Sequence, residues 1–115
     1  MRENLKDKTR LLHILEAIDN IFEFIEAKTF EEYQSNKVLR FAIIKNLEII
    51  GEATYLLSKV FKKEHPQIQW TSIVAMRHVL VHGYYQIKDE IVWATIKTEL
   101  SPLREQVKLL LLMSS

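Results

Sequence analysis

The stretch that decides the fold reads NKVLRFAIIKNLEIIGEATYLLSKVFK, from Asn36 to Lys62. Its apolar residues recur at steps of three and four, which is the period of an amphipathic α-helix. So many apolar positions predict a central helix over 36–62 that is buried on two sides, one facing the chain's own core and one facing a partner. One stripe of this helix contains Leu39, Ala42, Ile43, Asn46, Ile49, Ile50, Ala53, Leu57 and Val60, and Phe41, Ile44 and Leu47 widen it.

Helices are also predicted on both sides of this stretch. Apolar residues at the same spacing predict a helix over Lys6–Glu26. Thr29–Glu32 has the form of a capping box, which predicts a short helical turn. Glu64–Pro66 is expected to end the central helix, because proline lacks an amide donor and restricts the residue before it.

The second half of the chain predicts three further helices. One runs from Trp70 to His82 and is expected to end at Gly83 with a positive φ. Asp89 can cap the next helix, and Ser101–Pro102 places proline at the first position of a last one. The predicted fold is therefore an all-α, up-and-down bundle of about five helices.

Composition supports one soluble domain over residues 1–115. The chain has 48% hydrophobic residues, two glycines, two prolines and no cysteine, which argues against hairpins, disulfides and thiolate metal sites. A charged N-terminus and the lack of a membrane-length apolar run predict a cytoplasmic protein that does not enter the membrane. The net charge of +1 means that any grip on nucleic acid must be local. A core this small also favours a homodimer.

Chemistry is concentrated between Arg77 and Tyr84. This segment holds a permanent cation, the two imidazoles of His78 and His82, and a phenol within eight residues. Arg77 offers a forked donor array suited to phosphate, and His82 can take or give a proton near neutral pH. These groups suffice for phosphodiester cleavage without a metal. The alternative is structural: Arg77 pairs with a helix carboxylate such as Glu52 or Glu48, and His82 caps helix carbonyls.

The order of these residues resembles a known family. Arg77, a gap of four, His82, Gly83 and then Tyr84 is similar to the R-x4-H-x-Y signature of the HepT-like branch of the HEPN superfamily. Relatives often have asparagine after the motif arginine, where this chain has His78. The similarity extends to Asn46–Ala53, Trp70, Ile91–Trp93 and Leu100–Leu103.

The resemblance implies a HEPN-like helical homodimer in which two motifs face each other and form a metal-independent endoribonuclease site, as in toxins. Arg77 would stabilise charge on the phosphate, and His82 would act as general acid or base. Glu52 would orient Arg77, and His78 would support the site. Tyr84 would accept AMP from a cognate MNT-type nucleotidyltransferase antitoxin, which would block the cleft. No cofactor is implied.

Two other functions remain open at this point. His78 and His82 are four residues apart, a spacing that can hold one metal ion, although Val79 stands where metallohydrolases of the H-E-x-x-H type carry their base. The chain can also be a non-catalytic module that binds nucleotide or presents substrate to a nucleotidyltransferase.

Several basic and aromatic residues also have two interpretations. Basic runs on the first and central helices are either solvated faces or surfaces that guide RNA or dock an acidic antitoxin. Tyr85 either stacks on a base or covers the core, and the core is favoured. The basic runs comprise Arg2, Lys6, Arg10, Lys59, Lys62 and Lys63.

Overall fold

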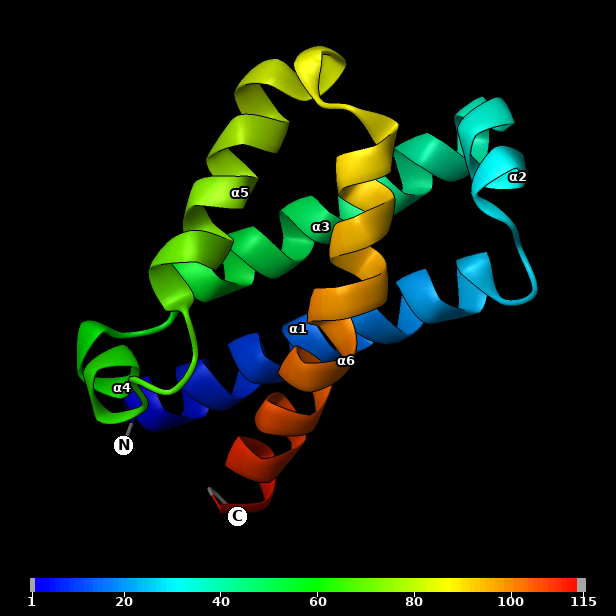
Figure 1. The fold of residues 1–115 in the computed structure, drawn as a ribbon. Coiled ribbons are helices and arrows are strands. Elements are labelled where there is room, and N and C mark those ends of the chain that lie inside the picture. The colour runs from blue at the N-terminus through cyan, green and yellow to red at the C-terminus, as the bar shows by residue number, and fades with distance from the viewer. Residues whose placement is uncertain (1, 114–115) are drawn as a thin grey trace.

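The computed structural model describes residues 2–113, apart from the side chains of residues 2–4 and 84. These residues form helices and no strand, so the predicted all-α class is confirmed (Figure 1). The helices are α1 (Arg2–Ile25), α2 (Phe30–Ser35), α3 (Lys37–Leu56), α4 (Lys59–Glu64), α5 (Trp70–Gly83) and α6 (Asp89–Met113), with a 3₁₀ turn, η1 (Tyr84–Gln86), between the last two.

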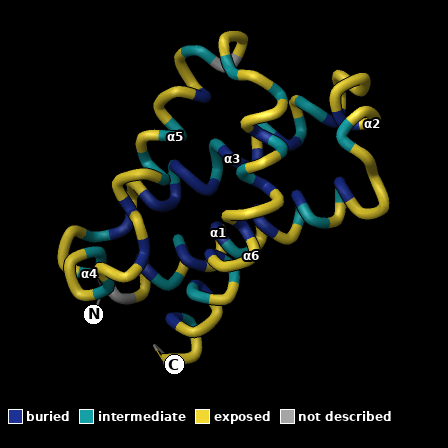
Figure 2. Tube along the Cα trace, in the orientation of Figure 1, coloured by how far each residue is buried: buried dark blue, intermediate teal, exposed yellow. Residues whose placement is uncertain are grey.

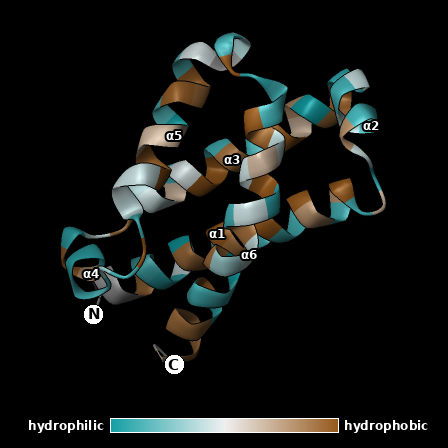
Figure 3. Cartoon of the chain, in the orientation of Figure 1, coloured by the Kyte–Doolittle hydropathy of each residue, from teal (hydrophilic) through white to brown (hydrophobic). Residues whose placement is uncertain are grey.

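Helix α3 is the centre of the fold. It packs along α1 and along α5, while α6 crosses over α1 (Figure 1). The buried segments lie where α1, α3 and α6 meet, and the same segments are rich in hydrophobic residues (Figures 2 and 3). Across the part of the chain that the structure describes, no helix combines the length and the apolar character needed to cross a membrane.

The wide apolar stripe of α3 has a cause inside the chain. Because α1 and α5 both pack on α3, the helix is buried on two sides without a partner molecule. Leu47 is buried and Ile44 is half-buried, whereas Phe41 remains largely exposed. The inference of a partner from stripe width is therefore corrected for Ile44 and Leu47.

The predicted C-terminal end of the central helix is wrong. Helix α3 ends at Leu56, and after Leu57 and Ser58 a separate helix, α4, begins. Ser58 caps α4, its Oγ accepting a hydrogen bond from the amide of Phe61. The amide and the hydroxyl of Ser58 in turn donate to the Asp7 carboxylate at 2.8 and 2.7 Å. Val60, which was expected in the stripe, consequently turns outward.

Replacing Asp7 with alanine should lower the free energy of unfolding by about 1–3 kcal/mol. The side chain is buried, and its loss leaves two donors of Ser58 without their acceptor. Urea unfolding followed by circular dichroism measures the effect. Glu16→Ala, on the exposed face of the same helix, is the matched control and should stay within about 0.5 kcal/mol of the parent. Equal stability of the two variants would contradict this account of the break.

Two other boundaries differ from the sequence prediction. The fourth and fifth predicted helices form one continuous helix, α6, with Pro102 inside it. The apolar stripe continues across the proline, and its burial offsets the hydrogen bond that the proline cannot make. Gly83 has no positive φ, because α5 runs directly into the 3₁₀ turn. The predicted capping box at Thr29 and Glu32 is present.

Candidate active site

Helix α5 carries the polar segment and approaches α3 most closely at Gly51. A Cβ atom added at Gly51 would lie 2.1 Å from Cβ and 3.1 Å from Cα of Arg77, which no real side chain tolerates. Glycine inside a helix costs roughly 0.5–1 kcal/mol relative to alanine, so its presence here requires a reason. The reason is that Arg77 sits on the bare backbone of α3.

This contact was missed from the sequence. The available signal was an isolated glycine in the middle of a strong helical pattern, which often marks a packing constraint. The sequence could not show which residue packs against Gly51. The structure identifies it as Arg77, whose Cα and Cβ atoms pack directly against the backbone of Gly51. This contact is called here the seat of Arg77.

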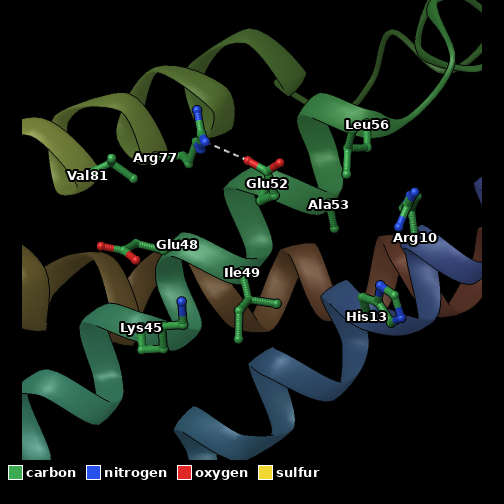
Figure 4. Close-up of a pocket in the computed structure, with 10 residues that line it drawn as sticks. All are labelled: Arg10, His13, Lys45, Glu48, Ile49, Glu52, Ala53, Leu56, Arg77 and Val81. Carbon is green, nitrogen blue, oxygen red and sulfur yellow. Dashed lines mark ion pairs between the residues drawn. The ribbon is translucent and has the colours of Figure 1, made fainter.

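The guanidinium, at the far end of the Arg77 side chain, forms an ion pair with Glu52, the residue after Gly51. Arg77 Nη2 lies 2.7 Å from Glu52 Oε2 (Figure 4). The guanidinium also lies over the ring of Tyr55, 6.0 Å from its centroid. The side chain of Arg77 keeps 30% of its surface exposed, so a ligand can still reach it. The structure thus forms the Arg77–Glu52 ion pair, which both the structural alternative and the orienting role of Glu52 predicted.

A pocket of about 360 Å³ opens beside this ion pair, between α1, α3 and α5. Figure 4 shows its charged side chains around an apolar centre formed by Ile49. From the sequence, helix α1 was expected to offer at most a basic surface that guides RNA, not residues that line the pocket of Arg77. The ionisable residues that line the pocket are Arg10 and His13 from α1, Lys45, Glu48 and Glu52 from α3, and Arg77 from α5.

His78 and His82 form a second pair, on a different face of α5. Their ring centroids are 4.6 Å apart, and both side chains are exposed. His82 is five residues after Arg77, which places it about 140° around the helix and about 7.5 Å along it. It does not line the pocket that holds Arg77. One chain therefore does not bring Arg77 and His82 together.

Other expectations about this segment have mixed outcomes. No hydrogen bond joins His82 to a helix carbonyl among the residues that the structure describes. Tyr84 begins the 3₁₀ turn, but its side chain lies outside the described part of the chain. Tyr85 is 73% exposed, so its expected place over the core is wrong. The side chain of Arg2 is likewise outside the described residues.

A metal site needs several His, Cys, Asp or Glu side chains close together. Within residues 2–113, as far as their side chains are described, no three His, Cys, Asp or Glu residues are grouped so that they could hold a metal ion. His78 and His82 remain a pair without a third ligand.

Helix α5 thus carries a guanidinium fixed by an ion pair and two neighbouring imidazoles. Comparison with known proteins shows which family the chain matches. A family model described as "Ribonuclease HepT-like" matches residues 14–110, which include all of α3 and α5. The chain belongs to the HepT-like ribonuclease family. The resemblance deduced from the R-x4-H-x-Y motif is confirmed.

Several relatives of this HepT-like chain match it over most of their length. "Probable ribonuclease HepT" of Thermococcus cleftensis is 38% identical over 97 residues, which are 84% of this chain and 88% of the relative. "Putative RNase TTE0752" of Caldanaerobacter subterraneus subsp. tengcongensis is 38% identical over 98 residues, 85% of this chain and 88% of the relative. "Putative RNase MJ1380" of Methanocaldococcus jannaschii is 31% identical over 102 residues, 89% and 94% of the two chains. No solved structure matches this HepT-like chain.

Proposed function

We propose that this HepT-like chain is a metal-independent endoribonuclease toxin that acts in the cytoplasm as a homodimer. The observation that carries the proposal is the Arg77–Glu52 pair, seated on Gly51 in a pocket, within a chain that belongs to a ribonuclease family. RNA is its substrate. An MNT-type nucleotidyltransferase is its antitoxin.

Arg77 and His82 divide the chemistry between them. The ribose 2′-oxygen attacks the neighbouring phosphorus, the bond from phosphorus to the 5′-oxygen breaks, and a 2′,3′-cyclic phosphate and a 5′-hydroxyl are left. Arg77 stabilises the negative charge that grows on the phosphate oxygens, and a donor of this kind acts best when it is held in place beforehand. Glu52 provides that support. His82 takes the proton of the 2′-hydroxyl or gives one to the leaving oxygen.

The separation of Arg77 from His82 supports a site shared by two chains. Because the two side chains point about 140° apart on α5, a single chain presents only one of them to a given phosphate. A second copy facing the first supplies the missing partner. His78, beside His82, supports that imidazole from 4.6 Å.

Tyr84 is the proposed control point. Its phenol oxygen would attack the α-phosphorus of ATP held by the nucleotidyltransferase, forming a Tyr–AMP phosphodiester and releasing pyrophosphate. Tyr84 is the second residue after His82, so the added group would place bulk and negative charge where an RNA phosphate has to enter. Modification would therefore silence the nuclease.

The chain purified without AMP should cleave single-stranded RNA in the presence of EDTA, because none of the proposed steps uses a metal. Intact mass spectrometry establishes the absence of AMP, and gel analysis detects the cleavage. After incubation with the antitoxin and ATP, the mass should rise by whole AMP units and cleavage should stop. Tyr84→Phe is the matched control, and it should keep its mass and its activity.

One result would overturn the nuclease. If the AMP-free dimer leaves RNA intact and still binds the nucleotidyltransferase, the chain is the non-catalytic module of that complex. Cleavage that EDTA abolishes would instead point to a metal held by His78 and His82.

A further inference from the structure

The pocket beside Arg77 contains cations that the proposed reaction does not use. We propose that Arg10 and Lys45 bind RNA phosphates near the one that is cleaved, so that this pocket, named here the Arg10 pocket, holds the backbone of a single strand. The inference rests on the proposed function, since it takes RNA as the ligand. Nothing in the chemistry assigned to Arg77 and His82 requires it.

Arg10 provides the first observation. It is half-buried in the wall of the pocket, and its Nε is buried without a hydrogen-bond partner among the described residues. A buried donor on a charged group is costly to leave unsatisfied. Glu52 Oε2 in the same pocket is also buried without a hydrogen bond, but it has a charge partner in Arg77, whereas Arg10 has no ion pair among the described residues. An anion in the pocket would supply the charge partner that Arg10 lacks. The basic run that the sequence placed on this helix therefore contains one residue that is not simply solvated.

The charges around the pocket favour an anion. Glu52 is compensated by its ion pair with Arg77, at 2.7 Å. Of the remaining permanent charges, Arg10 and Lys45 face Glu48 alone, which leaves one positive charge in excess, and protonation of His13 would add another. Figure 4 shows Arg10 and His13 on one side of Ile49 and Lys45 on the other.

The shape of the pocket favours a nucleic-acid backbone over an acidic protein surface. Its cations surround a concave apolar floor of Ile49, Ala53 and Leu56, on which a ribose can lie while its phosphate reaches the rim. Arg77 lines the same pocket, so a strand bound there continues directly to the arginine that acts on the scissile phosphate. Single-stranded RNA is bound in this way by grooves that follow the backbone with positive charge.

Binding of a fluorescein-labelled, unpaired RNA to the His82→Ala dimer tests the pocket, because that background leaves the RNA uncut. Anisotropy is measured at several salt concentrations for Arg10→Gln, Lys45→Gln and the control Lys28→Gln. Lys28 is exposed in the loop after α1, and its loss removes the same charge. We expect about tenfold weaker binding for Arg10→Gln, at least threefold for Lys45→Gln, and a salt slope smaller by about 0.7 for each. Lys28→Gln should bind as the parent does.

Several results would overturn the inference: no measurable RNA binding by the parent, equal binding by all three variants, or a loss confined to nucleotidyltransferase binding, which would identify an acidic protein surface as the ligand. Thermal unfolding checks that Arg10→Gln is folded, and exposed Lys45 gives an independent answer. Cleavage assays separate this inference from the proposed function. If RNA binding depends on Arg10 but the chain never cleaves RNA, the pocket is supported and the proposed nuclease activity is rejected. If the chain cleaves RNA and the substitutions of Arg10 and Lys45 have no effect, the nuclease activity is supported and the pocket is rejected.

Discussion

Replacing His82 with alanine should lower the rate of RNA cleavage by roughly 100- to 10,000-fold, the range expected when a general acid or base is removed. The imidazole of His82 carries the proton transfer in the proposed reaction. Because the side chain is exposed, the substitution should leave the stability within about 0.5 kcal/mol of the parent. Single-turnover cleavage of a labelled RNA in EDTA measures the rate.

His78→Ala is the matched control for this experiment, since it removes the neighbouring imidazole from the same helix face. We expect a smaller loss, because His78 is assigned only a supporting contact. If His78→Ala abolished cleavage and His82→Ala did not, the two roles would be exchanged. If neither changed the rate, the imidazoles would have no part in the reaction.

Gly51→Ala should both destabilise the fold and slow RNA cleavage. The new methyl group would fall within 2.1 Å of Arg77 Cβ, and the contact is with atoms next to the backbone, so α5 has to move away from α3. Overpacking of this kind costs about 1–3 kcal/mol, more than the gain in helix propensity. Moving Arg77 by about an ångström should also slow cleavage by about 100-fold. Chemical denaturation and the cleavage assay report the two effects.

The other glycine is the control for stability. A Cβ atom at Gly83 would meet only Oε1 of Gln86, at 3.7 Å, an ordinary contact, and Gly83 has no positive φ. Gly83→Ala should therefore leave the stability unchanged or raise it by up to about 1 kcal/mol. Comparable stability of the two alanine variants would show that the seat of Arg77 does not require glycine.

Periodicity predicted the long helices because each buries a continuous apolar face. It failed where a distant residue decides the outcome: the break before α4 depends on Asp7 and Ser58, which are 51 positions apart. It failed again at Pro102, where the proline signal was local but the buried stripe of α6 continues through it. Local signals thus located the helices, while long-range contacts set their ends.

The site was predictable to the extent that one helix carries it. The run from Arg77 to Tyr84 was evident from the motif, and Glu52 was among the acids expected near Arg77. The contribution of α1 was not evident, because the placement of Arg10 beside Arg77 depends on how α1, α3 and α5 pack together. That Arg77 and His82 point apart, in contrast, follows from their spacing of five residues on a helix and could have been predicted from the sequence.

The most direct test of the central claim is a mixed dimer of Arg77→Ala and His82→Ala chains, co-expressed with two different tags and purified through both. If each site is shared by two facing chains, the mixed dimer has two sites. One of them combines the intact Arg77 of one chain with the intact His82 of the other. We expect the mixed dimer to regain about half of the parent's cleavage rate, while the homodimer of each variant remains inactive. A mixed dimer as inactive as the two variants would contradict it.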